Sequence, residues 1–284
     1  WLLQKIHTDC RQYNGEKPCG FDDYCASCAH YSPMGKRILI IKLGAAGDAL
    51  RTTPMLRELA NIHGRIHVTW VTDKVSYELL KGNPYIDKLM LLDWDTASIL
   101  TAQKFDVCYS ADKAPAALAL SVHVQAGEKY GYTMDAYGSM TVFDDAGTYA
   151  LMLGMSDPLK FRKNEKTYQE FTFDMLHVPW KEQPYVLNIT DEDRLAAKEK
   201  LDSLLAVQRP IIGLNTGAGS VFATKKWPKE NFVDLAKQLK SGMDCTLLIM
   251  GGPSENERNK EILKELGAMV VDGGCDNSIR LFTA

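Results

Sequence analysis

The chain has 284 residues, of which 45% are hydrophobic and 24% charged, a composition that excludes a disordered, collagen-like or small disulfide-scaffold protein. At about 150 residues per domain, this length predicts about two domains. The 33 basic and 36 acidic residues give a formal net charge of −3, so no overall positive field favours nucleic acid. The apolar runs are far shorter than the roughly 20 residues that cross a bilayer, and no signal-peptide pattern is recognisable. We expect a cytoplasmic protein, and the initial Trp1 indicates that residues upstream have been lost.

Four of the seven cysteines lie close together near the start of the chain, at Cys10, Cys19, Cys25 and Cys28. In a reducing compartment such a cluster is more often a metal site than a set of disulfides, and Cys25 and Cys28 have the spacing of a chelating pair. Residues 1–35 show little apolar periodicity, so a cross-link is the expected source of their order. We expect this element to hold a structural Zn²⁺ or an iron–sulfur cluster, with free surface thiols or one adventitious disulfide as the alternative.

Residues 36–180 alternate between strand and helix patterns, which predicts a first domain with a parallel sheet. The continuous apolar run at 37–43 is typical of a strand buried on both faces. After the glycine-containing loop 44–48, a helix is predicted to begin at Pro54 with Thr53 as its N-cap. Further strands are predicted at 66–71, 86–92 and 105–110, helices at 75–81 and 164–180, and a sheet edge or turn at 130–132, while 138–163 has no clear pattern.

The same pattern restarts in residues 181–284, so the fold class is α/β with two Rossmann-like domains facing a cleft. Helices are predicted at 191–205, 229–240 and 255–266, a buried strand at 211–214, and further strands at 245–250 and 269–271. An open α/β sheet usually needs about five or six strands to bury its faces. The second domain therefore looks incomplete, and we expect the natural protein to continue beyond Ala284.

The loop after the first strand contains Gly44, Gly47 and Asp48. It matches neither the dinucleotide fingerprint nor the Walker A loop, since the glycine spacing is wrong and no Gly-Lys-Ser/Thr follows. It is a tight turn at the carboxyl end of a parallel strand, where open α/β sheets bind ligands. Asp48 is thus either a general base or an aspartate that caps a turn or helix.

A second loop, at 215–220, contains Gly217 and Gly219 between residues with hydroxyl groups, and the cations Lys225 and Lys226 follow it. Backbone N–H groups, hydroxyls and lysines that converge after a strand suit a diphosphate. The alternative is a glycine-rich connection with solvated lysines.

Three motifs resemble the signatures of glycosyltransferase family nine, the ADP-heptose:lipopolysaccharide heptosyltransferases. They occupy residues 38–48 with 52–54, residues 212–220 with 224–228, and residues 250–255, in the order in which the family has them. The resemblance covers about Arg37 to Ala284 and implies a GT-B fold, with the acceptor on the first domain and the nucleotide-sugar on the second. It also implies inverting transfer of a heptose without a catalytic metal.

The resemblance further implies roles for individual residues. Asp48 matches the aspartate proposed to deprotonate the acceptor hydroxyl, and Glu255 matches an acidic position near the nucleoside ribose. The remaining matches are Gly44, Gly47 and Thr52 for the acceptor, and Thr216, Gly217, Ala218, Gly219, Ser220, Lys225 and Lys226 for the donor diphosphate.

The partners implied by the resemblance are ADP-heptose or another nucleotide-sugar and a glycolipid acceptor of the lipopolysaccharide core or another surface glycan. Peripheral contact with the inner face of the cytoplasmic membrane follows from such an acceptor. The chain departs from the family by lacking its Asp-Thr-Gly-x-x-His type motif, and the four cysteines resemble a subgroup feature. The alternative function is a nucleotide-binding regulatory or scaffold protein with a four-cysteine metal module and no catalysis.

Overall fold

A computed structural model describes residues 6–13, 19–21, 25–204, 210–217 and 225–284. The chain divides into two compact units, Trp1–Asn188 and Ile189–Ala284, here called the N-terminal and C-terminal units. Residues just before the boundary are tied to the N-terminal unit, because Val186 N donates to Thr53 Oγ1 (2.9 Å) and Val186 O accepts from Asn83 Nδ2 (3.1 Å). None of the helices in the described ranges is long and apolar enough to cross a membrane.

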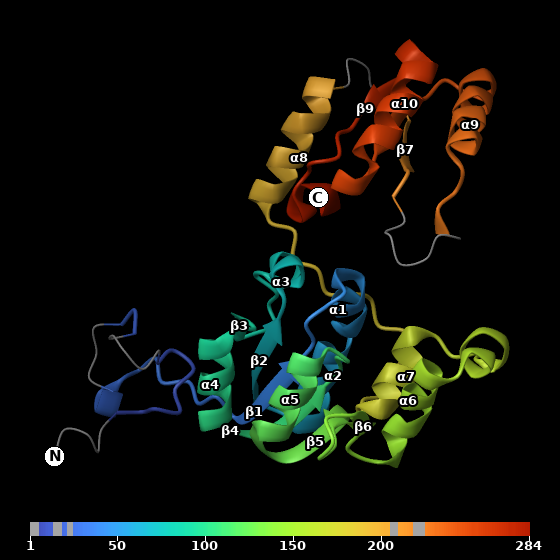
Figure 1. Cartoon of the computed structure of the whole chain (residues 1–284). Helices are drawn as coiled ribbons and strands as arrows, with labels where there is room; N and C mark the ends of the chain where they lie inside the picture. The colour runs from blue at the N-terminus through green and yellow to red at the C-terminus, as the bar shows by residue number, and fades with distance from the viewer. Residues whose placement is uncertain (1–5, 14–18, 22–24, 205–209, 218–224) are drawn as a thin grey trace. The chain divides into compact units, whose positions relative to one another are not determined.

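The N-terminal unit is built on a six-stranded sheet in the order β3-β2-β1-β4-β5-β6 (Figure 1). The first five strands are parallel, and the last pairs antiparallel with β5. The strands are β1 (Lys36–Ile41), β2 (Ile66–Thr72), β3 (Lys88–Leu91), β4 (Lys104–Ser110), β5 (Gln125–Met134) and β6 (Met140–Val142). The strand order reverses between β1 and β4, which is the point where open α/β sheets bind ligands.

Helices cover both faces of this sheet. They are α1 (Ala46–Thr52), α2 (Met55–His63), α3 (Lys74–Leu80), α4 (Trp94–Ala102), α5 (Pro115–His123), α6 (Thr148–Met155) and α7 (Tyr168–Met175), with a π-helical turn η4 (Leu159–Lys163) between the last two. Ile38 and Ile40 of β1 pack into a cluster with α2 and α7, whereas Leu39 and Ile41 pack into a second cluster with α4 and α5. The prediction of a strand buried on both faces is confirmed.

The start of the first helix differs from the prediction. A seven-residue helix, α1, begins at Ala46, so Asp48 lies in its first turn. Thr53 does not cap the next helix, because its Oγ1 donates to Leu50 O (2.7 Å) and accepts from the backbone of Val186. Pro54 occupies the N-cap position of α2 without a side-chain hydrogen bond, so the predicted cap was wrong.

The predicted sheet edge or turn at 130–132 lies instead inside β5, which is paired on both sides. Gly131 has φ +99°, and a Cβ at this position would lie 2.0 Å from Ser110 O on β4. Glycine is therefore required at this position of the strand. Because glycine is also common in turns, the segment had the sequence pattern of a turn. The unassigned segment 138–163 contains β6, α6 and η4.

The C-terminal unit contains a parallel three-stranded sheet in the order β7-β8-β9. Its elements are α8 (Asp191–Leu204), β7 (Ile211–Asn215), α9 (Lys229–Gly242), β8 (Thr246–Met250), α10 (Asn256–Leu266), β9 (Val270–Asp272) and α11 (Ile279–Thr283). Leu247 and Ile249 of the central strand are fully buried and pack with Ala236 of α9 and Ile262 of α10.

The expected burial of the strand at 211–214 was wrong at its first residue. Ile211 of β7 is 46% exposed, because β7 has a single neighbouring strand among the described residues. Helix α8 has no buried residue, and its Leu195 and Leu201 are exposed. The helix is held instead by Asp193, which forms an ion pair with Arg280 of α11.

Candidate functional site

Asp48 lies at the carboxyl end of β1, in the first turn of α1, and its side chain is 33% exposed. One carboxylate oxygen, Oδ1, accepts a hydrogen bond from the guanidinium of Arg51 one turn later. Within the described part of the chain, the other oxygen, Oδ2, accepts no hydrogen bond. Asp48 therefore has a partly exposed side chain with one carboxylate oxygen that can accept a proton.

Arg51 is held between Asp48 and an aromatic ring. Its guanidinium lies 4.2 Å from the centroid of the Tyr168 ring on α7, in cation–π geometry. Thr52 is buried, and its hydroxyl donates to Asp48 O (2.8 Å) inside the helix and lies 3.5 Å from Tyr168 OH. Thr52, which was predicted to contact the acceptor, thus uses its hydroxyl within the protein. Nothing in the local sequence indicated that Tyr168 would reach α1.

The loop that leads from β1 to Asp48 is clamped by a buried ion pair. Lys42 Nζ lies 3.0 Å from Asp112 Oδ2, and both side chains are less than a tenth exposed. The same oxygen accepts hydrogen bonds from Leu43 N (2.9 Å) and Gly44 N (3.1 Å), while Asp112 Oδ1 accepts from Ala114 N (2.8 Å). The signal that could have identified the pair is a lysine within a buried apolar run and an aspartate just after the strand at 105–110.

The charge state of Asp112 follows from these partners. Burial alone would raise the pKa of this carboxyl group. The Lys42 ammonium and the N–H groups of Ala114 and Gly44 outweigh burial and hold the pKa of Asp112 below its usual value. The pair is therefore ionised at neutral pH and fixes the two loops at the reversal of strand order.

The two loop glycines have different surroundings. A Cβ at Gly44 would lie 2.6 Å from Asp73 Oδ2, so the loop passes close to the residue that caps α3. A Cβ at Gly47 would meet nothing within 4 Å. A side chain at Gly44 would therefore displace the Asp73 carboxylate, whereas Gly47 leaves the surface beside Asp48 open.

In the C-terminal unit, Thr216 follows β7 and is 2% exposed. Its N–H donates to Met250 O (3.0 Å), and its hydroxyl donates to Asn259 Oδ1 on α10. The next residue, Gly217, has its N–H bonded to Asn215 Oδ1 (3.0 Å). The other residues predicted for this loop, Ala218, Gly219 and Ser220, lie outside the described residues.

Glu255 lies next to this loop and is 4% exposed. Its Oε2 accepts from Gly252 N (3.0 Å), its Oε1 accepts from Ser254 Oγ (2.8 Å), and a Cβ at Gly217 would lie 3.3 Å from Oε2. The structure thus brings together Thr216, Gly217 and Glu255 at the carboxyl ends of β7 and β8.

Lys225 and Lys226 are both exposed and precede α9. The adjoining segment is attached to α10 by Arg258, which donates to Trp227 O and to Thr216 O (3.3 Å). Arg258 therefore joins the lysine segment to the Thr216 loop. Arg258 could not be predicted from the local sequence, because its spacing is that of an ordinary solvated helix arginine.

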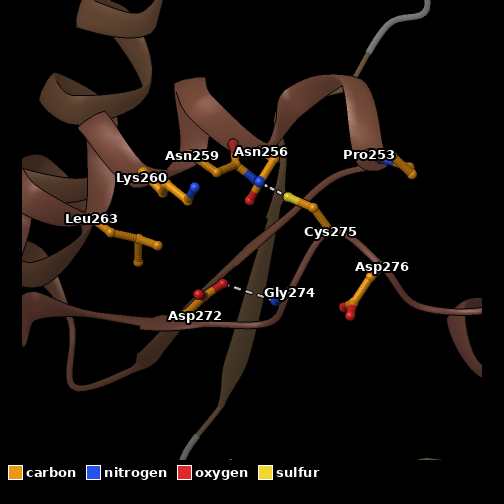
Figure 2. A pocket seen from close by; sticks show the side chains of 9 residues that line it. All are labelled: Pro253, Asn256, Asn259, Lys260, Leu263, Asp272, Gly274, Cys275 and Asp276. Atoms are coloured by element: carbon orange, nitrogen blue, oxygen red, sulfur yellow. Dashed lines mark hydrogen bonds between the residues drawn. The ribbon is translucent and has the colours of Figure 1, made fainter.

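A cavity of about 310 Å³ lies between α10 and the chain that follows β9 (Figure 2). On its wall, Asn259 Nδ2 donates to Cys275 Sγ (3.2 Å), and Gly274 N donates to Asp272 Oδ1 (2.8 Å). Burial and the nearby carboxylates raise the pKa of the Cys275 thiol, which is therefore neutral at neutral pH. The lining residues are Pro253, Asn256, Asn259, Lys260, Leu263, Asp272, Gly274, Cys275 and Asp276.

The N-terminal cysteines do not form a complete ligand set. No group of three or more His, Cys, Asp or Glu side chains suited to a metal ion occurs among the described residues, which include Cys10, Cys19, Cys25 and Cys28. Cys25 and Cys28 belong to one tight turn, in which Cys28 N donates to Cys25 O (3.3 Å). The N–H of His30 also donates to Cys28 Sγ (3.3 Å).

Comparison with solved structures shows which folds this architecture resembles. The glycosyl transferase family 9 protein from Veillonella parvula DSM 2008 aligns with a TM-score of 0.65 at 21% identity, over 87% of this chain and 71% of that chain. Escherichia coli ADP-heptose LPS heptosyltransferase II aligns with a TM-score of 0.58 at 16% identity, over 87% and 75%. E. coli heptosyltransferase WaaC, solved with ADP, aligns with a TM-score of 0.54 at 18% identity, over 85% and 75%. No curated protein sequence matches the chain.

The fold, with parallel α/β units and polar side chains at the carboxyl ends of the strands, is therefore that of the GT-B-like glycosyltransferases. Residues 98–272, more than half of the chain, match the family model described as glycosyltransferase family 9 (heptosyltransferase). The chain belongs to this family and is a glycosyltransferase.

Proposed function

We propose that the protein transfers a heptose, or a similar sugar, from ADP-heptose or another nucleotide-sugar to a hydroxyl of a glycolipid acceptor. The acceptor belongs to the lipopolysaccharide core or another surface glycan, and the transfer inverts the anomeric centre without a catalytic metal. The observation that carries this proposal is the accessible Asp48 carboxylate at the carboxyl end of β1, beside the reversal of strand order. Ligands of open α/β sheets bind at such a position.

The chemistry requires a base on the face of the sugar opposite the leaving group. Asp48 accepts the proton of the acceptor hydroxyl as its oxygen bonds to the anomeric carbon, and the bond from that carbon to the diphosphate breaks. Arg51 holds Oδ1 of the carboxylate, which leaves Oδ2 for the proton. Gly47, which leaves open space beside Asp48, and the backbone of Gly44 accommodate the acceptor, with Thr52 supporting the helix from within.

The donor binds to the C-terminal unit in this proposal. The cavity beside α10 accepts the nucleoside, with Glu255 near the ribose and Asp272 and Asp276 as further acceptors for its hydroxyls. The loop at 216–220 and the cations Lys225 and Lys226 take the diphosphate and stabilise the charge that develops as it departs. The support from relatives is that E. coli WaaC has been solved with ADP and with ADP-2-deoxy-2-fluoro heptose.

Replacement of the proposed base tests this function. Asp48→Asn should lower kcat for transfer from ADP-heptose about 10²–10⁴-fold, while calorimetry shows unchanged affinity for ADP. Asp95→Asn is the matched control, since Asp95 is an exposed aspartate in the first turn of another helix, α4. Transfer by Asp48→Asn at the rate of the control would refute the assignment.

We also propose that Cys10, Cys19, Cys25 and Cys28, which the structure does not gather into one ligand set, come together around a structural Zn²⁺, with an iron–sulfur cluster as the alternative. The support is the turn at Cys25–Ser27 and the N–H of His30 directed at the Cys28 sulfur. Elemental analysis of the purified full chain should find about one zinc per chain, which is lost in the Cys25→Ser/Cys28→Ser variant. Visible absorption would indicate iron–sulfur instead, and a metal-free, folded protein would refute both.

A further inference from the structure

Large apolar side chains are exposed along one short part of the N-terminal unit. Met152 and Met155 at the end of α6 are 43% and 70% exposed, and Phe161 in η4 is 64% exposed. Figure 1 shows this part of the chain as a coil that extends beyond α6 and α7, away from the sheet. Single exposed apolar residues are ordinary, but several in one short segment mark an interaction surface.

The same segment is basic in a chain that is acidic overall. Residues 152–163 include Lys160, Arg162 and Lys163, all exposed, against one acidic residue, Asp157. Lys160 Nζ lies 5.0 Å from the centroid of the Phe161 ring, so cation and aromatic ring lie side by side. This mixture of exposed apolar and cationic groups is typical of a surface that meets anionic headgroups and the acyl boundary beneath them.

Hydrogen bonds give the segment a defined shape. Asn164 N donates to Leu159 O (2.9 Å) to close the π-helical turn, and Leu159 N donates to Ser156 Oγ (3.3 Å). Tyr149 OH on α6 donates to Asn164 Oδ1 (2.7 Å), which ties the turn back to the helix. Phe161 and its basic neighbours are thus displayed by a turn anchored at both ends.

The segment is adjacent to the loops around the candidate base. Lys113 directly follows Asp112 of the buried ion pair, and its Nζ lies 4.8 Å from the centroid of the Tyr132 ring. A Cβ at Gly154 of α6 would lie 3.2 Å from the same Nζ. Desolvation and the nearby charges of Lys160 in η4 and of Lys42 lower the pKa of Lys113.

We propose that Met152, Met155, Lys160, Phe161, Arg162 and Lys163 form a membrane-docking surface that binds anionic phospholipid bilayers. The apolar side chains enter the boundary between headgroups and acyl chains, and the three cations contact lipid phosphates. The purpose of this docking rests on the proposed function, because a glycolipid acceptor lies in such a bilayer. The binding itself requires neither donor nor acceptor, so it can be tested separately.

Co-sedimentation of the full chain with acceptor-free vesicles tests the docking. The chain should bind vesicles of phosphatidylglycerol and phosphatidylethanolamine, lose binding at high salt, and bind phosphatidylcholine vesicles weakly. Phe161→Ser and Lys160→Glu/Lys163→Glu should each weaken binding, the charge reversals by about tenfold or more. Trp94→Ser and Lys88→Glu are matched controls, because both residues are exposed and lie outside the surface.

The outcomes separate this proposal from the proposed function. Failure of the wild-type chain to bind anionic vesicles, equal binding to phosphatidylcholine, or unchanged binding by the variants would overturn the docking surface; circular dichroism checks that the variants fold. A docking variant should keep transfer to a delipidated acceptor in solution and lose transfer to the same acceptor in vesicles. Absence of all transfer with intact vesicle binding would refute the proposed function alone.

Discussion

Lys42 Nζ and Asp112 Oδ2 lie 3.0 Å apart in an ion pair that joins the residues following β1 to those following β4. These two strands are neighbours at the reversal of strand order, so the pair crosses the place where the sheet opens toward a ligand. The residues that it fixes, Leu43 and Gly44, lead directly into the helix that carries Asp48.

Removal of one partner of this ion pair should destabilise the protein, relative to the number of charges removed, much more than removal of both. Lys42→Met and Asp112→Leu each leave a buried charge without its counter-charge and should each lower the free energy of unfolding by about 3–5 kcal/mol. The double variant removes both charges and should lose considerably less than the sum. Denaturant unfolding followed by circular dichroism measures this cycle, and additive losses would show that the pair is not coupled.

The same pair predicts a loss of stability in acid. Because the pKa of Asp112 is depressed in the folded protein, the unfolded chain binds its proton at a higher pH. The stability from this group is fully present above the unfolded pKa of about 3.9 and is lost as pH falls through the lower folded value. Thermal unfolding between neutral and acidic pH should therefore show a steeper decline for the wild type than for Lys42→Met/Asp112→Leu. If the melting temperatures of the two proteins fell in parallel with pH, the depressed pKa of Asp112 would be contradicted.

The Tyr168 ring that packs against the Arg51 guanidinium should influence the rate of transfer. Tyr168→Leu removes the aromatic face, worth about 0.5–1 kcal/mol at an exposed site, and should lower kcat a few-fold by releasing Arg51 from Asp48. Tyr168→Phe keeps the ring and loses only the long contact with the Thr52 hydroxyl, so its kcat should stay near that of the wild type. Equal losses in both variants would assign the effect to the hydroxyl group instead.

The parts of the fold that were predictable from the sequence are those set by local pattern. The apolar run at 37–43 predicted β1, because residues that face both clusters must all be apolar. Helix α1 was missed because seven residues with a proline shortly after them carry no clear apolar period. The burial of Ile211 was overestimated because an apolar run does not show whether a strand lies at the edge of a sheet.

In the candidate site, too, some residues could be predicted from local sequence patterns and others could not. Asp48 and Glu255 lie in the short helical segments that closely follow β1 and β8, so their place at the carboxyl end of a sheet could be predicted. Asp112 and Arg258 were missed because each acts on a segment far away in the sequence, 70 residues for Asp112 with Lys42 and 42 for Arg258 with Thr216. Such pairings depend on strand order and on the packing of helices, which local patterns do not specify.

The Thr216 hydroxyl should stabilise the C-terminal unit through its hydrogen bond to Asn259. Thr216→Val leaves the buried Asn259 Oδ1 without its donor and should cost about 1–3 kcal/mol of unfolding free energy, measured as faster hydrogen exchange in α10. Because Asn259 also lines the cavity and bonds to Cys275, the same variant should weaken ADP binding. Thr216→Ser keeps the hydroxyl and should preserve both properties. If Thr216→Val weakened ADP binding without faster exchange, the hydroxyl would instead contact the nucleotide directly.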